Sequence, residues 1–221
     1  MNEKQDQERP TFLVILGAAA DEFLSHGFSG TSMERIAESA GVSKRTVYNH
    51  FPSKESLFQA ILAELRRRIG DTEYVEYSRV SPLAGQLKVI GGVYAATISA
   101  GDFIKLARVL IAEAIQNPAF SRATMVEQHR LRQNIVSWIK AGKTDGRLSV
   151  QNPDLAAAQF CGSIRELAFW PQLMGGQPPI SVQQRQALVN TSVEVFLGHY
   201  GSDGAVEQIP IGREQTPTRV E

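Results

Sequence analysis

Residues 28–58 read FSGTSMERIAESAGVSKRTVYNHFPSKESLF and hold two short helical patterns with a turn between them. The first pattern, over residues 33–39, ends before Gly41, because glycine readily takes the left-handed conformation that follows many helices. The second pattern, over residues 44–50, follows Ser43, a residue type that caps helix N-termini. We therefore predict a helix-turn-helix, the arrangement in which the second helix enters the major groove of DNA.

The first helix of this pair is preceded by Thr31-Ser32-Met33-Glu34, which has the form of a capping box. In that motif the Thr31 hydroxyl accepts a hydrogen bond from the Glu34 amide, and the Glu34 carboxylate reaches back to the helix start. The sequence therefore predicts that Thr31 caps the helix over residues 33–39.

The second helix divides into an apolar side and a polar side when residues are spaced by about 100°. Val47 and Phe51 are its apolar pair, and we expect them to pack against the helix over residues 33–39. The opposite side is polar and consists of Arg45, Thr46 and Asn49, flanked by Tyr48 and His50.

Two residues of the polar side are suited to reading base edges. Arginine can bridge O6 and N7 of guanine and asparagine can pair with N6 and N7 of adenine, each contact discriminating by roughly 1–3 kcal/mol. We therefore expect Arg45 and Asn49 to read bases, with Thr46 beside them. Phosphate contacts, which fix register but not sequence, are expected from Thr31, Ser32, Ser43, Lys44, Tyr48, His50 and Lys54.

The rest of the chain has helical periodicity and no strand alternation. A ten-residue polar lead precedes a helical pattern that Gly27 ends, and Ser53 caps a long helix that closes the first unit at about residue 69. Further helices are predicted where apolar residues recur at three- and four-residue steps, with Ser181 and Gln184 in capping-box positions. These helices cover residues 82–100, 102–116, 119–142, 153–174 and 181–200.

The predicted fold class is therefore all-α. An N-terminal three-helix DNA-binding domain carries the helix-turn-helix, and together with the following long helix it occupies residues 10–69. A second helical domain occupies residues 70–200. Residues 201–221 carry few apolar side chains and are expected to form a flexible tail.

Composition and charge exclude several classes of protein. The 221 residues are 43% hydrophobic and carry 23 basic and 23 acidic side chains, so a general polyanion binder is not indicated. Basic residues exceed acidic ones only locally, between Gly41 and Ser56. One cysteine and four histidines indicate no disulfide framework, structural metal or other cofactor. With no signal peptide and no apolar run of about 18–20 residues, we expect a cytoplasmic location and no membrane partner.

The helix-turn-helix segment resembles the TetR family of bacterial transcriptional regulators. The resemblance covers about residues 10–69 and rests on Gly41-Val42-Ser43-Lys44, Tyr48, Phe51 and Ser53-Lys54-Glu55. Arg45 and Asn49 depart from it, since the family often has glycine and tyrosine there, so the operator sequence cannot be inferred from a relative. DNA contacts by Lys44, Tyr48, His50 and Lys54 are what the resemblance implies.

The second half is similar to the AefR-like branch of this family. The similar segments are Leu106–Ala114 with Asn117-Pro118, Gly146-Arg147-Leu148 and Pro153–Phe160. The resemblance implies a ligand-binding and dimerisation domain: a homodimer formed through the last two helices, with an effector cavity among the middle helices.

Bulky side chains of the middle helices are candidates to line that cavity, although most of them are expected to be core. Pro171 should interrupt its helix and open space beside it. Cys161 lies in an apolar stripe and is expected to be a small core residue, not a redox sensor. The candidate effector-binding residues are Tyr94, Phe103, Trp138, Phe160, Arg165, Phe169 and Trp170.

These observations predict a dimeric regulator that binds a palindromic, double-stranded DNA operator, because two recognition helices need two half-sites. A repressor released by a small apolar or amphipathic effector is the favoured interpretation, and a transcriptional activator is the alternative. A helical enzyme or lipid carrier with a remnant helix-turn-helix is a second class, which the lack of an acid-base or nucleophile constellation disfavours. We expect no enzymatic activity.

Overall fold

The computed structural model describes residues 3–70, 75–116 and 132–202 of the chain. Within these ranges the regular elements are helices, and the β-type pairing is an isolated bridge between Leu148 and Gly201. The all-α prediction is therefore confirmed. Most of the predicted tail over residues 201–221, and the part of the predicted helix 119–142 before residue 132, lie outside the described residues.

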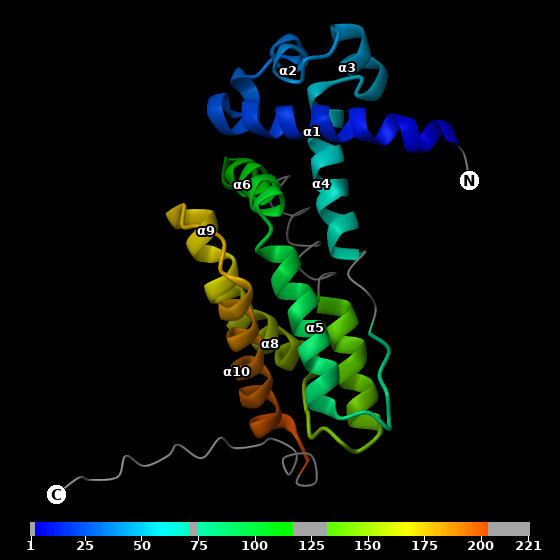
Figure 1. Ribbon diagram of the computed structural model, residues 1–221, viewed down its shortest axis with the longest axis vertical. Helices are drawn as coiled ribbons and strands as arrows, with labels where there is room; N and C mark the ends of the chain where they lie inside the picture. The colour runs from blue at the N-terminus through cyan, green and yellow to red at the C-terminus, as the bar shows by residue number, and fades with distance from the viewer. Residues whose placement is uncertain (1–2, 71–74, 117–131, 203–221) are drawn as a thin grey trace, which may run out of the picture.

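Four helices make up the first half of the molecule (Figure 1): α1 (Glu3–Gly30), α2 (Met33–Ser39), α3 (Lys44–His50) and α4 (Lys54–Gly70). Helix α1 begins at Glu3, so the prediction of a non-helical polar lead was wrong. Polar residues such as glutamate, lysine and glutamine are good helix formers, and Pro10 lies inside the helix. Gly27 interrupts α1 as predicted, because its φ of 71° is left-handed.

Figure 1 shows α1 lying across the molecule, with α2 and α3 on one side of it and α4 leading away from the other. Buried side chains of all four helices fill the space between them. Phe12 of α1 packs on Phe51, which follows α3, with ring centres 5.1 Å apart. Val47 of α3 and Phe58 of α4 are almost fully buried. The core therefore fixes the orientation of α3.

The second half contains α5 (Leu83–Ile98), α6 (Gly101–Gln116), a helix over residues 132–144, α8 (Pro153–Ala168), α9 (Trp170–Gly175) and α10 (Val182–Tyr200). The α5, α6 and α10 bounds agree with the predicted ranges to within two residues. Helix α10 begins with the predicted capping box, in which Ser181 and Gln184 bond reciprocally.

The predicted helix over residues 153–174 is two helices, α8 and α9. The backbone breaks at Phe169, whose φ and ψ of −126° and −57° end α8. Pro171 then stands in the first turn of α9, where its missing N–H leaves no bond unmade. The interruption expected from Pro171 is present, and it lies at Phe169, two residues before the proline.

Helix α5 packs against α8 and α10, and Gly91 faces residues of both helices. A methyl group at Gly91 would lie 3.0 Å from Val189 Cγ1 and 3.1 Å from Phe160 Cζ. Only a residue without a side chain allows the three helices to meet at this distance.

Ion pairs join the two halves of the molecule where α6 meets α1 and α4. Asp21 of α1 pairs with Lys105 of α6 at 2.6 Å, and Arg68 of α4 pairs with Asp102 of α6. Arg68 also bonds Glu64, a nearly buried carboxylate of α4. Helix α6 is therefore held by charge to both long helices of the first half.

Candidate functional site

The start of α2 differs from the prediction. Ser32, and not Thr31, is the N-cap, because the Ser32 hydroxyl accepts from the Arg35 amide at 3.2 Å. The Thr31 hydroxyl is 3% exposed and donates towards the carbonyls of Glu22 and Gly27 at 3.0 and 2.8 Å. Thr31 faces the end of α1, so its hydroxyl fastens α2 to α1 and is not presented to DNA.

The start of α3 agrees with the prediction. Ser43 is the N-cap and accepts from the Thr46 amide at 3.0 Å, and the two hydroxyl groups lie 2.7 Å apart. Gly41 in the preceding turn has the left-handed φ of 65° that glycine favours. The turn and the first turn of α3 are thus fixed by local interactions.

Helix α3 has the two sides that its sequence predicts. Val47 and Phe51 are 0% and 2% exposed, whereas Arg45 and Asn49 are exposed. Neither Arg45 nor Asn49 hydrogen-bonds or ion-pairs with another residue of the described part of the chain. Their donors and acceptors are therefore free to meet a base edge without breaking an existing contact.

Lys44, also exposed, already has partners. Its ammonium forms an ion pair with Glu34 of α2 and lies 5.7 Å from the centre of the Tyr48 ring. The hydrogen bond from Lys44 lowers the pKa of Glu34, and the Glu34 carboxylate raises the pKa of Lys44. A DNA phosphate near Lys44 would compete with this carboxylate.

Lys54, predicted to contact phosphate, holds the turn between α1 and α2. Its Nζ donates to the Thr31 carbonyl at 2.9 Å and to the Ser29 carbonyl at 3.3 Å, and lies 4.7 Å from the centre of the Phe28 ring. These contacts join residues 23 and 25 positions apart, and no local sequence signal could have indicated them. Lys54 therefore positions the start of α2.

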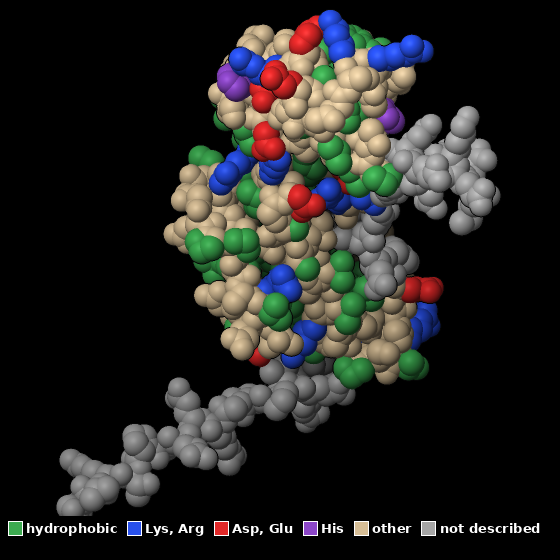
Figure 2. Space-filling view, turned by 45° about the horizontal axis from the view of Figure 1, so that its top comes forward, with side chains coloured by type: hydrophobic (Ala, Val, Ile, Leu, Met, Phe, Trp, Pro, Cys, Tyr) green, Lys and Arg blue, Asp and Glu red, His purple; other side chains and the backbone are tan. Residues whose placement is uncertain are grey.

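The remaining predicted contacts lie around the same end of the molecule. His50 is half-buried beside Phe51, with ring centres 6.1 Å apart, while Ser32 and Tyr48 are exposed. On the face that Figure 2 shows, the lysine and arginine side chains of this end are interspersed with aspartate and glutamate. The balanced charge of the sequence is thus also mixed in space.

The candidate effector residues are mostly core. Tyr94, Phe103, Phe160 and Phe169 are buried, and Trp170 is half-buried with its ring centre 5.2 Å from that of Phe169. Trp138 is 2% exposed, and its indole N–H donates to Gln86 at 3.1 Å. Gln86 in turn bonds the loop that leads into α5, so Trp138 has a structural role there.

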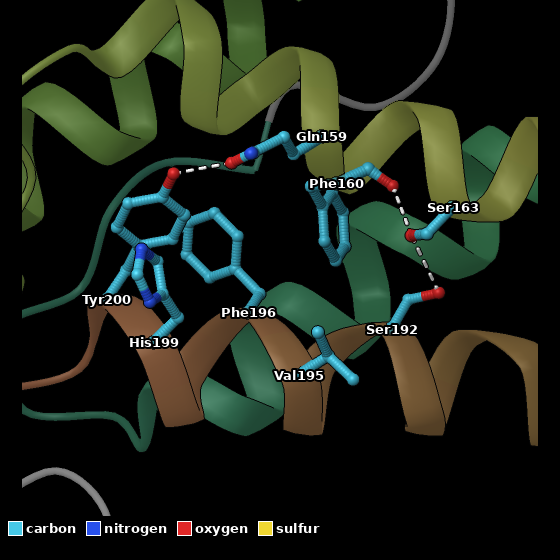
Figure 3. A pocket seen from close by; sticks show the side chains of 8 residues that line it. All are labelled: Gln159, Phe160, Ser163, Ser192, Val195, Phe196, His199 and Tyr200. Atoms are coloured by element: carbon cyan, nitrogen blue, oxygen red, sulfur yellow. Dashed lines mark hydrogen bonds between the residues drawn. The ribbon is translucent and has the colours of Figure 1, made fainter.

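Two of the hollows in the described part of the molecule lie against α10. The first, of about 350 Å³, lies between α8 and α10 and is mainly apolar, as Figure 3 shows. It is lined by Gln159, Phe160, Ser163, Ser192, Val195, Phe196, His199 and Tyr200. The second, of about 290 Å³, lies between α5 and α10 and carries Lys88 and Arg185. Neither hollow is lined by Trp138 or Trp170.

Cys161 is buried in the core of the second half, and burial raises the pKa of its thiol to about 12. The thiol is therefore protonated at neutral pH, as expected of an unreactive core cysteine. No group of three or more histidine, cysteine, aspartate or glutamate side chains within the described ranges is placed to hold a metal ion. None of the helices there combines the length and apolar character needed to cross a bilayer.

Both halves of the chain match known families. Residues 15–61 match the family described as bacterial regulatory proteins, tetR family. Residues 85–202 match the one described as AefR-like transcriptional repressor, C-terminal domain.

Relatives agree with these matches. The chain is 26% identical over 177 residues to the HTH-type transcriptional regulator UidR of Escherichia coli (strain K12), covering 76% of this chain and 83% of that protein. The crystal structure of a TetR family transcriptional regulator from Pseudomonas syringae pv. tomato is 37% identical, with a TM-score of 0.71, covering 89% of this chain and 98% of that one. The structure titled Flavonoid-responsive Regulator FrrA is 25% identical, with a TM-score of 0.67, covering 88% and 98%.

The exposed polar side of α3, its helix-turn-helix support and the matches along both halves lead to one conclusion. The chain belongs to the TetR family of bacterial regulatory proteins and is a DNA-binding transcriptional regulator.

Proposed function

We propose that this regulator is a homodimeric repressor that binds a palindromic operator and releases it when a small apolar or amphipathic effector binds. The observation that carries the proposal is the α3 surface, where Arg45 and Asn49 are exposed and unpaired while Val47 anchors the helix from behind. We take residues 10–69 as the DNA-binding unit and residues 70–200 as the effector-binding and dimerisation unit. Because its relatives regulate transcription, we propose no catalytic role.

We assign the operator contacts by what each side chain is free to do. Arg45 and Asn49 read base edges in the major groove. Ser32, Tyr48 and Lys44 contact phosphates, together with Ser43, Thr46 and His50. Thr31 and Lys54 act indirectly, because the Lys54 ammonium and the Thr31 hydroxyl hold the α2 start in place.

We place the dimer contact on α8 and α10. Leu155 and Leu167 of α8 are 53% and 56% exposed, and Val195 of α10 is 68% exposed. Gly162 and Gly198 on the same helices leave open space where a side chain would stand, so a partner helix can approach closely. An apolar face that also carries two glycines, with an apolar hollow between its two helices, fits a second copy of the chain.

Effector release requires that a ligand in the second half change the position of α3. FrrA is named as a flavonoid-responsive regulator, and we propose an amphipathic small molecule as the effector here also. Helix α6 connects the two halves: Arg108 donates to the Gln172 and Leu173 carbonyls of α9. At the other side α6 pairs with Arg68 and Asp21. We propose two conformations of the chain that differ in the position of α6. An effector that binds these conformations with unequal affinity would shift the equilibrium between them, and with it the position of α3.

Selection of bound duplexes from a random pool, using the full chain, tests this function. We expect an enriched palindrome whose half-sites lie about 34–36 Å apart. The matched control is the double variant Arg45→Ala, Asn49→Ala, which should enrich no palindrome. Recovery of no enriched site by the wild-type chain would overturn the proposal.

A further inference from the structure

Among the described residues of the second half, one buried side-chain polar atom has no hydrogen-bond partner. The Nε–H of Arg165, on α8, is shielded from solvent and forms no hydrogen bond. A buried donor without an acceptor destabilises the fold, and each such group in a native protein calls for an explanation, such as strain, a bound water or ion, or a functional role. Arg165 therefore calls for an acceptor that the chain itself does not supply.

The surroundings of Arg165 contain donors and positive charge. Cys161 lies one turn earlier on α8, and Tyr94 lies one turn after Gly91, the residue of α5 whose Cβ would lie 3.3 Å from Ile164 Cδ1 of α8. Burial raises the pKa of Tyr94 and of Cys161, while the charges of Arg165 and Arg132 act on both groups in the opposite direction. Two guanidinium groups therefore act electrostatically on a phenol and a thiol that both keep their protons.

The region is short of acceptors. No ion pair within the described residues involves Arg132 or Arg165. Arginine offers only donors and forms paired bonds with carboxylate groups, whereas an ionised carboxylate offers only acceptors. The nearby aromatic residues supply an apolar wall, since Phe169 lies one turn after Arg165 and packs on Phe103 with ring centres 6.3 Å apart.

We propose that Arg165 and Arg132, with the Tyr94 hydroxyl, form the polar end of the effector site and bind the carboxylate of a small apolar acid. This inference rests on the effector-released function proposed above and specifies the ligand class for it. The two positive charges select an anion, the Tyr94 O–H gives a further donor, and the apolar wall excludes strongly hydrated acids. Phe169 lies between α8 and α9, and the Gln172 and Leu173 carbonyls of α9 accept hydrogen bonds from Arg108 of α6, which connects this site to α6.

Matched acids and amides test the proposal on the full chain. The probes are benzoate with benzamide, cinnamate with cinnamamide, and 2-naphthoate with 2-naphthamide, which differ within each pair mainly by the negative charge. Binding is followed by the shift in melting temperature and then titrated by calorimetry. We expect at least one acid to bind ten-fold or more tightly than its amide.

Substitutions of single arginines test which residues cause the preference for the acid over the amide. Arg165→Gln should reduce the acid preference to less than two-fold while amide binding persists, and Arg132→Gln should reduce it several-fold. The control Arg185→Gln, in the hollow between α5 and α10, should retain it. Equal binding of acid and amide in all three pairs, or a preference that survives Arg165→Gln, would overturn the inference.

Operator binding by the wild-type chain is measured separately, without any acid. If the wild-type chain binds no operator without acid, the proposed function is overturned. If it binds an operator but shows no preference for acids over amides, only the proposed ligand class is overturned. The unliganded melting temperature of Arg165→Gln shows whether that variant folds, and Arg165→Lys, which keeps the charge, should retain part of the preference.

Discussion

The exposed side of α3 and the exposed faces of α8 and α10 differ in chemistry although both are open to solvent. On α3 the exposed side chains are long and polar, with Arg45 and Asn49 free of partners. On α8 and α10 they include Leu155, Leu167 and Val195. The first surface suits a polyanion with hydrogen-bonding bases, and the second suits an apolar protein face. Exposure alone does not distinguish a solvated surface from a binding surface, whereas the kind of side chain does.

The largest effect is expected from Val195→Arg, which places a charge on the α8/α10 face without touching the core. An unpaired charge in a dimer contact is strongly unfavourable, and a monomer contacts one half-site only. Operator affinity should fall by about 100-fold or more, and sedimentation should show a monomer. Val80→Arg, at a residue 94% exposed in the segment before α5, is the control. A dimer that survives Val195→Arg would place the interface elsewhere.

The second effect concerns base reading by α3. Arg45→Ala should weaken binding to the selected operator by roughly 1–3 kcal/mol and relax the preference at one base pair of each half-site. Competition assays with singly substituted operators measure both quantities. The control is Arg79→Ala, which removes an equal charge outside the helix-turn-helix. A loss that is the same for every DNA sequence would reassign Arg45 to a phosphate.

Lys54→Met separates positioning from charge at the same DNA-binding end. Two carbonyls lose a charge-assisted donor, so operator affinity should fall by about ten-fold for all sequences, and the melting temperature should also fall. The dependence of log affinity on log salt should keep its slope to within about 0.3.

A slope that falls by about one unit on Lys54→Met would show instead that this ammonium contacts a phosphate. Lys54→Arg, which keeps a cation able to reach the same carbonyls, is the matched control and should restore most of the affinity.

The smallest effect concerns the junction between the two halves of the molecule, where α4 meets α6. Hydrogen bonds from Arg67, and to a smaller extent from Arg68, lower the pKa of the Glu64 carboxyl group below its ordinary value of 4.5. Burial acts in the opposite direction but does not cancel this effect. A carboxylate with a lowered folded-state pKa stabilises the fold above its unfolded pKa, and this contribution is lost as pH falls through the folded pKa.

Glu64→Gln should therefore lower the free energy of unfolding by about 1 kcal/mol at pH 7. The difference from wild type should shrink below about pH 4.5, as urea titrations across pH 3–7 can measure. Glu76→Gln, at an exposed residue outside this cluster, is the control. A difference that does not change with pH would show that the charge of Glu64 is not what matters.

Local rules predicted the fold and much of the site. The caps Ser43 and Ser181, the left-handed Gly41 and the two sides of α3 depend on residues within four positions of one another, and the structure confirms them. The N-cap of α2 was predicted wrongly because Thr31 and Ser32 are both able to cap. Packing against α1, which no local pattern encodes, turned Thr31 inward.

Long-range contacts account for the rest of what sequence reasoning missed. Lys54 meets carbonyls 23 and 25 residues away, and its local pattern is that of any lysine at a helix start. The unpartnered Arg165 Nε results from burial among several helices, so a list of candidate residues could include Arg165 without revealing its missing acceptor.

The contact at Gly91 limits how this chain can be redesigned. Gly91 lets α5 touch α8 and α10, and Tyr94 lies one turn further along the same helix. A mutant library that seeks a new sensing specificity should leave position 91 unvaried. A side chain there would spread the helices proposed to join the two subunits, and altered sensing would then be confounded with altered assembly.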